Sequence, residues 1–288
     1  MKLSPSIPKL VAIHDLSCVG RAALTVVIPI LSAMGIQVCP LPTAVLSTHG
    51  RFPGCHFVDL TNEMEPIIAH WRFLGRHFDG VYSGFLGSAS QVEIISAFIR
   101  DVSQDTQLVV IDPVLGDYGK VYGITDEALV QAMQHYIRLA DVITPNITEA
   151  ALLLNEPYRD DLDETTAKDW MKRLADKGPK IVILTSVPNL EKPTHITSMA
   201  YQRENGEFLD VTAEAIPSQF PGTGDAFTSV ITGLLLQGEQ LSVAVERAVE
   251  FLVKAMTITH AQHTPERDGI ALEAVLPHLL DHHARCCL

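Results

Sequence analysis

The sequence is poor in cationic residues and has no long apolar run. Its 288 residues include 21 Lys and Arg against 34 Asp and Glu, a formal net charge of −13. This balance disfavours nucleic-acid binding, which depends on neutralising phosphates with lysine and arginine. No apolar stretch is as long as a membrane span, and no cationic leader precedes an apolar signal core. We therefore expect a cytoplasmic protein that binds neither nucleic acid nor membrane.

Cysteine is scarce, and one common nucleotide-binding motif is missing. The five cysteines show no metal-ligand spacing, and their odd number fits a reducing compartment. No G-x-x-x-x-G-K-[ST] motif occurs, because Gly119-Lys120 lacks the required spacing. This argues against a P-loop kinase but not against ATP, because local N–H groups and a divalent metal can outweigh a global field. The 47% hydrophobic content predicts a globular chain.

Apolar runs of strand length alternate with segments of helical periodicity. The predicted strands are 10–14, 37–40, 80–83, 107–111, 142–143 and 180–184, with a hairpin at 196–201 and 206–211. The predicted helices are 22–34, 63–74, 91–102, 126–139, 148–154, 165–177, 226–236 and 241–260. Repeated βα units predict an α/β fold with a mainly parallel central sheet and helices on both faces. No linker or repeat divides the chain, so we expect a single domain over 1–288 with a frayed tail at 280–288.

A glycine-rich turn precedes the first of the two last predicted helices. Gly222 and Gly224 permit backbone angles that other residues resist, so successive N–H groups can point at one anion. Asp225 would repel that anion unless it takes a proton from an attacking hydroxyl. The combination suggests phosphoryl transfer to an alcohol. The alternative is an ordinary turn in which Asp225 caps the helix.

Polar residues follow several of the predicted strands, where ligands bind in open α/β sheets. They are His14-Asp15, Ser83-Gly84, Asp112, Thr144-Pro145-Asn146 and Thr185-Ser186. Asn146 and Glu149 begin a helix and can face the same side, next to Asp112 from a neighbouring strand. Carboxylates and amides with retained waters suit Mg²⁺ bound to phosphates. The same spacing also fits a capping box, with Asn146 as N-cap and Glu149 as its partner.

Several motifs in order resemble the ribokinase-like superfamily, and more closely the pyridoxal/pyridoxamine kinases. They are Ala12-Ile13-His14-Asp15-Leu16-Ser17, Leu46-Ser47-Thr48-His49, Tyr82-Ser83-Gly84-Phe85-Leu86-Gly87-Ser88, Asp112-Pro113-Val114-Leu115-Gly116-Asp117, Thr144-Pro145-Asn146 with Glu149, and Gly222-Thr223-Gly224-Asp225. The similarity covers about Leu10 to His260. It implies a three-layer ribokinase-like fold and an ATP-dependent kinase that acts on the 5′-hydroxymethyl group of a B6 vitamer: pyridoxal, pyridoxamine or pyridoxine.

The resemblance also implies roles for individual residues. Asp225 is the expected catalytic base, beside an anion hole of Gly222, Thr223 and Gly224. The expected ATP-binding residues are Asp112, Thr144, Asn146, Glu149, Thr185, Ser186 and Lys120, the last in a loop over the phosphates. The expected cofactors are ATP and Mg²⁺, with a monovalent cation as a further candidate. Asp112 and Glu149 are expected to hold the Mg²⁺. For Lys120, a solvated loop lysine is the alternative.

The vitamin pocket departs from the family pattern at several positions. The expected substrate-binding residues are Asp15, Ser17, His49, Ser83, Phe85 and Asp225. Asp15 stands where many relatives have a serine and can pair with a protonated ring nitrogen, or it is a turn residue. His49 either bonds ring substituents or is structural, and Phe85 replaces a common tyrosine and can stack. Gly50-Arg51 departs from the family pattern, because it stands where relatives often have a threonine or another polar pair.

Two other functions fit the same residues. A hydroxymethylpyrimidine kinase of the same fold acts on a substrate of similar size, and a panel of substrates with ATP separates the two kinases. A non-catalytic regulator that binds a vitamin or a nucleotide predicts binding without turnover. Against the regulator stand Asp225 and Glu149, since a protein without turnover does not need a carboxylate facing an anion hole. Relatives are commonly homodimers, so we expect the same here.

Overall fold

The computed structural model describes residues 7–102 and 106–279, and the predicted frayed tail lies outside these residues. A large sheet contains the strands β1 Lys9–Ser17, β2 Gln37–Leu46, β3 Phe57–Asp59, β4 Gly80–Ser83, β5 Leu108–Ile111, β8 Val142–Ile143, β9 Ile181–Pro188, β10 His195–Gln202 and β11 Glu207–Glu214. Within the described residues it is a nine-stranded sheet in the order β11-β10-β9-β8-β5-β4-β1-β2-β3. The strands from β9 to β2 in this order are parallel, and β10, β11 and β3 are antiparallel to their neighbours.

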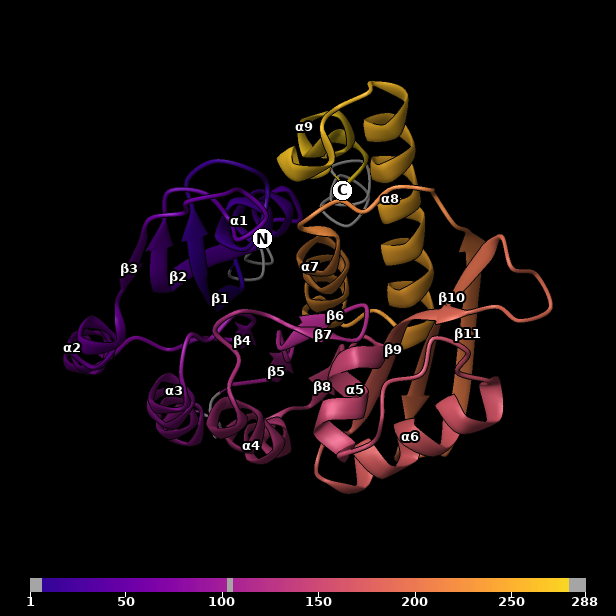
Figure 1. The fold of residues 1–288 in the computed structure, drawn as a ribbon. Coiled ribbons are helices and arrows are strands. Elements are labelled where there is room, and N and C mark those ends of the chain that lie inside the picture. The colour runs from indigo at the N-terminus through magenta and orange to yellow at the C-terminus, as the bar shows by residue number, and fades with distance from the viewer. Residues whose placement is uncertain (1–6, 103–105, 280–288) are drawn as a thin grey trace, which may run out of the picture.

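Helices cover both faces of this sheet (Figure 1). They are α1 Leu24–Ala33, α2 Thr61–Phe73, α3 Ala89–Val102, α4 Glu127–Tyr136, α5 Ile147–Leu154, α6 Glu164–Asp176, α7 Thr223–Leu236, α8 Leu241–Ala261 and the short α9 Leu272–Val275. Two short 3₁₀ segments cover Ile137–Leu139 and Glu266–Asp268. Helices α2 to α6 pack on one face, and α1, α7 and α8 pack on the other. No helix of the described chain is both long and apolar enough to cross a membrane.

Alternating side chains of the strands build two apolar cores. On β1, Val11 and Ile13 belong to the core under α2 to α6, whereas Leu10 and Ala12 belong to the core under α1, α7 and α8. Successive side chains of a strand point to opposite faces of the sheet. The next two residues of β1 therefore also leave on opposite sides, which separates the surroundings of His14 and Asp15.

The predicted α/β fold, its parallel sheet and the hairpin of β10 and β11 are confirmed. Several element ends were predicted wrongly. Strand β2 continues from the predicted end at residue 40 to Leu46 through Pro40 and Pro42. Prolines usually end a strand because they lack a backbone N–H. Here β3 pairs only with residues 44–46 of β2, so the part of β2 that contains Pro40 and Pro42 pairs with β1 alone. Among the described residues, its other side has no partner strand that would need the missing N–H groups. The short strands β3, β6 (Gly116–Asp117) and β7 (Lys120–Val121) were not predicted.

Candidate active site

The polar residues predicted at the strand ends meet at the carboxyl edge of the parallel sheet. Backbone hydrogen bonds join the segments that carry them: the Asp112 N–H donates to Ser83 O at 2.8 Å, and the Thr185 N–H donates to Pro145 O at 3.0 Å. Asn146 and Thr185 also form an isolated parallel bridge. The strands β9, β8, β5, β4 and β1 lie side by side in the sheet. Their carboxyl ends therefore form one continuous rim below the start of α7.

Helix α7 begins at Thr223, three residues before the predicted start, and Gly222 is its N-cap. Gly222 has φ 80°, and a Cβ there would lie 2.4 Å from Arg21 O, so glycine is required on both counts. Asp225 is thus inside the first turn and is not the cap. The first backbone N–H groups of a helix have no intrahelical partner. Those at the start of α7 can therefore donate to an anion, as predicted for Gly222 to Gly224.

The Asp225 carboxylate lies between two elements of the N-terminal part. Its Oδ2 accepts a hydrogen bond of 2.8 Å from the Ala23 N–H, and its Oδ1 is 3.7 Å from His14 Nδ1. Burial raises the pKa of Asp225, and the Ala23 N–H opposes that rise. The side chain keeps 17% exposure, so a substrate hydroxyl can reach it. A partly desolvated carboxylate with a raised pKa is a suitable general base.

Asp112 and Glu149 form a buried acidic pair beside this turn. Burial and the Asp225 charge raise the pKa of Asp112, and burial and the Asp112 charge raise the pKa of Glu149. Glu149 also completes a capping box with Asn146, and its Oε1 accepts from the Leu115 N–H at 3.2 Å. The capping-box alternative is therefore present in the structure. Within the described ranges, no group of three or more His, Cys, Asp or Glu is arranged to hold a metal ion.

These two carboxylates nevertheless fit a Mg²⁺ that is bound mainly by phosphates. Such an ion keeps several waters and takes only one or two protein carboxylates. Two buried acids whose pKa values are raised by burial and by neighbouring carboxylates gain from a nearby cation, because it favours both ionised forms. The metal role of Asp112 and Glu149 stays a prediction.

A short two-stranded ribbon, β6 and β7, covers the predicted ATP side. It is fixed to α5 by hydrogen bonds of 2.9 Å from Asn146 Nδ2 to Gly116 O and from the Gly119 N–H to Thr148 Oγ1. Tyr118 and Gly119 form its turn with φ 49° and 73°. Lys120 is exposed on this ribbon. The predicted phosphate-covering loop is thus an ordered ribbon, and the contact of Lys120 with a phosphate stays a prediction.

The end of β9 differs from the prediction. Its predicted end was residue 184, but the strand continues to Pro188 past a register shift opposite β10. Ser186 is exposed there with φ 59°, while Thr185 is half-buried. Thr144 is buried at the end of β8, and its Oγ1 accepts from Thr228 Oγ1 of α7 at 2.9 Å. The predicted ATP-side residues therefore gather on one rim, with Ser186 at its outer edge.

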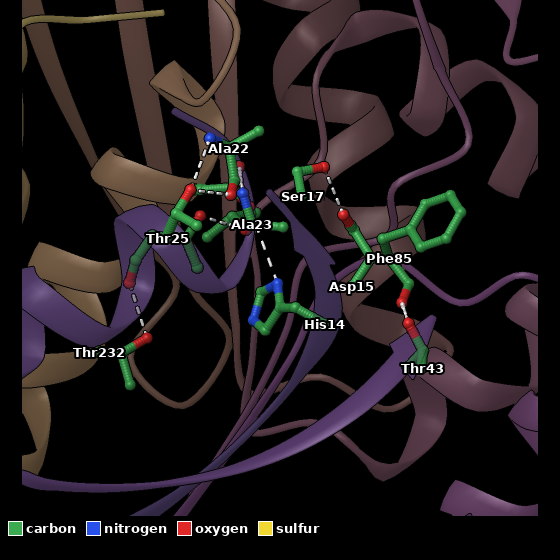
Figure 2. Close-up of polar contacts among 12 residues, drawn as sticks. His14, Asp15, Ser17, Ala22, Ala23, Thr25, Thr43, Phe85 and Thr232 are labelled. Atoms are coloured by element: carbon green, nitrogen blue, oxygen red, sulfur yellow. Dashed lines mark hydrogen bonds and ion pairs between the residues drawn. The ribbon is translucent and has the colours of Figure 1, made fainter. Parts of the chain in front are cut away.

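Four of the predicted vitamin-binding residues, Asp15, Ser17, Ser83 and Phe85, lie at or just after the carboxyl ends of β1 and β4. Asp15 is buried, and its Oδ2 accepts from Ser17 Oγ at 2.8 Å. Figure 2 shows Ser17 and Phe85 close to Asp15, with Thr43 Oγ1 donating to the Phe85 carbonyl oxygen at 3.1 Å. Ser83 is fully buried, and its Oγ has no hydrogen-bond partner among the described residues. Asp15, Ser17 and Phe85 thus lie close together, whereas the buried Ser83 faces Tyr136 of the core under α2 to α6; the contact of these four residues with a substrate stays a prediction.

His49 is engaged with the protein itself. Its Nε2 is 2.7 Å from Arg267 O, and its Nδ1 accepts from the Arg51 N–H at 3.3 Å. A Cβ on Gly20 would lie 2.5 Å from the His49 ring, so the imidazole fills a tight space. The geometry favours the structural alternative for His49. Arg51 Nη1 donates to Gln219 O at 2.5 Å, so Arg51 connects the loop after β2 to the segment that precedes α7.

Two contacts of the site were missed by the sequence analysis. His14 was recognised as a polar strand-end residue but received no role, and Ala23 was placed inside a helix. Ala23 precedes α1 with φ 52°, a conformation that exposes its N–H to Asp225. The only sequence signal for His14 was that a polar residue follows an apolar run at the end of a predicted strand. No sequence feature marked Ala23.

The chain is similar in sequence and fold to known kinases. Residues 71–268, more than half of the chain, match the phosphomethylpyrimidine kinase family. A Bacteroides thetaiotaomicron structure, provisionally assigned as a phosphomethylpyrimidine kinase and crystallised in a form with pyridoxal, is 50% identical with a TM-score of 0.92, over 95% of this chain and 96% of that one. Pyridoxal kinase from Lactobacillus plantarum is 34% identical with a TM-score of 0.89, over 97% and 99%. Pyridoxine/pyridoxal/pyridoxamine kinase of Bordetella avium is 27% identical over 94% of each chain.

The mainly parallel sheet, the glycine turn at the start of α7 and the carboxylate behind it define a kinase of the ribokinase-like class. Within that class, the chain belongs to the pyridoxal kinase family, whose shared domain is the phosphomethylpyrimidine kinase domain.

Proposed function

We propose that this enzyme transfers the γ-phosphoryl group of ATP to the 5′-hydroxymethyl group of pyridoxal, pyridoxamine or pyridoxine. The observation that carries the proposal is the Asp225 carboxylate in the first turn of α7, beside the free N–H groups of that turn. The names of the full-length relatives and the pyridoxal in one related crystal form support the choice of substrate. Substrate specificity rests on Asp15, whose carboxyl on β1 lies close enough to Asp225 for the Asp225 charge to raise its pKa.

In this mechanism Asp225 accepts the proton of the substrate hydroxyl. The hydroxyl oxygen forms a new bond to the γ-phosphorus while the bond from that phosphorus to the bridging oxygen of ADP breaks. Negative charge on the transferring group is stabilised by the N–H groups at the start of α7, which are in place before the reaction. Mg²⁺, when bound near Asp112 and Glu149, neutralises phosphate charge. In-line transfer of this kind depends mainly on positioning and on charge stabilisation.

A coupled assay of ADP release with each vitamer tests this function. We expect turnover with at least one vitamer and a loss of about 10²- to 10⁴-fold in kcat for Asp225→Asn, with little change in KM for ATP. The substitution keeps the size of the side chain and removes the base. A melting curve shows whether the variant is folded. Near wild-type turnover of a folded Asp225→Asn variant would remove Asp225 from the mechanism.

Hydroxymethylpyrimidine is the second candidate substrate, because the matched family and the Bacteroides structure are named for kinase activity on a related pyrimidine, phosphomethylpyrimidine. It belongs in the same assay as the three vitamers, and a kcat/KM for it above that of every vitamer would reverse the assignment. Tight vitamer binding in calorimetry without ADP release from any substrate would favour the regulator. The expected homodimer and cytoplasmic location stay predictions, and light scattering after size-exclusion chromatography measures the first.

A further inference from the structure

His14 is a buried ionisable side chain without a hydrogen-bond partner. It is 0% exposed at the carboxyl end of β1. Neither Nδ1 nor Nε2 has a hydrogen-bond partner among the described residues. Buried polar groups in folded proteins are nearly always hydrogen-bonded, so an exception of this kind calls for a reason.

Packing fixes the imidazole and directs it toward the base. Its Nδ1 is 3.7 Å from Oδ1 of Asp225, and the Tyr82 ring lies against it edge-on with centroids 4.4 Å apart. A Cβ on Gly84 would lie 2.3 Å from Nδ1, so only glycine leaves room for the ring there. In Figure 2, His14 and Asp15 leave β1 in opposite directions. The His14 side chain therefore lies on the side of β1 that faces Asp225.

The two oxygens of Asp225 have different surroundings. Oδ2 accepts the Ala23 N–H at 2.8 Å, whereas Oδ1 has no hydrogen bond from the described residues and faces the imidazole. One hydrogen bond leaves a carboxylate free to rotate about it. A second donor at Oδ1 would fix the plane of the group and so the direction of its remaining lone pairs.

The surroundings keep the imidazole neutral. Burial lowers the pKa of His14 to about 3. The ionisable groups around the His14–Asp225 pair are Asp15 on β1, Tyr82 on β4, Asp112 after β5 and Tyr122 after β7. A neutral imidazole carries one N–H, and the tautomer with the proton on Nδ1 directs it at Asp225.

We propose that His14 is a positioning residue for phosphoryl transfer, whose Nδ1–H holds Oδ1 of Asp225 so that the carboxylate faces the substrate hydroxyl. This inference rests on the proposed role of Asp225 as the base. The contact of 3.7 Å is too long for a hydrogen bond, and a shift of less than about 1 Å closes it. Such tightening on substrate binding is common for catalytic hydrogen bonds.

Two nearly isosteric substitutions test the proposal. His14→Asn keeps an N–H donor near the position of Nδ1, whereas His14→Leu has the same shape without a donor. We expect His14→Leu to lower kcat by about 10- to 100-fold, as misplacement of a catalytic group does, and to leave KM for ATP and for the vitamer within about twofold. His14→Asn should keep kcat within about threefold of wild type.

Stability separates positioning from a structural role. Leucine suits a buried site at least as well as asparagine, so the melting temperature of His14→Leu should not fall below that of His14→Asn. Equal kcat values for the two variants, or kcat values that follow the melting temperatures, would overturn the proposal.

The Asp225→Asn background links the inference to the base. There, adding His14→Leu should change single-turnover rates by less than about twofold, because the group that His14 positions is already inactive. If Asp225→Asn alone keeps wild-type turnover, both the proposed mechanism and this inference fail. If Asp225→Asn is inactive and His14→Leu matches wild type, only the inference fails.

Discussion

Asp15 shows how a single buried carboxyl combines a cost in stability with a use in binding. Burial raises its pKa to about 6, and the Asp225 charge adds to the rise that the hydrogen bond from Ser17 opposes. At neutral pH the folded protein therefore holds a negative charge in a poorly solvated place. A charge-assisted hydrogen bond to a ligand offsets the cost of burying this charge, and a protonated pyridine nitrogen would form such a bond.

We predict that Asp15→Asn makes the protein more stable and a poorer enzyme at neutral pH. The folded-state pKa of about 6 exceeds the ordinary value of 3.8, so the carboxyl stabilises the fold below pH 3.8 and loses that contribution as the pH rises through 6. Removing the charge should raise the free energy of unfolding at pH 7 by up to about 3 kcal/mol. Urea titrations of both proteins measure this difference.

The same variant reports on substrate binding. Loss of a charge-assisted pair should raise KM for the vitamer by about one to two decades and leave KM for ATP unchanged. The stability gain should shrink as the pH falls from 7 to 4. An unchanged vitamer KM would make Asp15 a structural residue of β1 alone.

At the level of the element, the start of α5 combines a helix cap with a candidate metal site. Glu149 accepts from the Asn146 and Leu115 N–H groups through its two oxygens, while the Asp112 charge raises its pKa. A cap alone does not need a second buried carboxyl beside it. The pairing of Glu149 with Asp112 is therefore the feature that points to a cation.

We predict that Glu149→Gln raises the Mg²⁺ concentration for half-maximal activity by about tenfold, because one anionic oxygen near the cation is lost. The measurement is the initial rate over a series of Mg²⁺ concentrations at saturating ATP and vitamer.

Asp163 provides the matched control, because it caps α6 by accepting from the Thr166 N–H at 2.8 Å. Asp163→Ala should lower the melting temperature and leave the Mg²⁺ dependence unchanged. If Glu149→Gln behaves like Asp163→Ala, Glu149 is only a cap.

At the scale of the whole molecule, the N-terminal part of the described chain contacts the segment at 267–273 near its other end. Arg21 Nε is 3.0 Å from a carboxylate oxygen of Glu273, and its Nη1 donates to Asp268 O at 3.2 Å. His49 reaches Arg267 O across 218 positions of sequence. These contacts hold the C-terminal segment near the Asp225 turn, although that segment carries no predicted site residue.

We predict that His49→Ala loosens two distant segments together. Loss of a mostly buried hydrogen bond and of a packed ring should cost about 1–3 kcal/mol of stability. Hydrogen exchange should rise in both 47–56 and 265–269, while KM for ATP stays unchanged. Arg72→Ala is the control, since it removes an exposed ion pair with Asp101 away from these segments. Faster exchange in 47–56 alone would contradict the coupling.

The order of elements and most of the rim residues could be predicted from the sequence. Strand and helix periods depend on neighbouring residues, and residues that end parallel strands share one edge of the sheet. The glycine turn and Asp225 were found because a short motif carries its own backbone requirement. Element ends were less accurate, as at Pro40 and at the start of α7, because pairing with other segments decides where a strand or helix begins and ends.

Only the tertiary structure decided how the base is held. The Ala23 N–H meets Asp225 across 202 positions of sequence, and His14 approaches the other oxygen from a different strand. Neither contact has a local signature, because each depends on the packing of α1 and α7 on one face of the sheet. The sequence alone determined which chemical groups line the rim of the sheet. Their distances, burial and pKa shifts arise only when segments far apart in the chain are packed together and water is excluded between them.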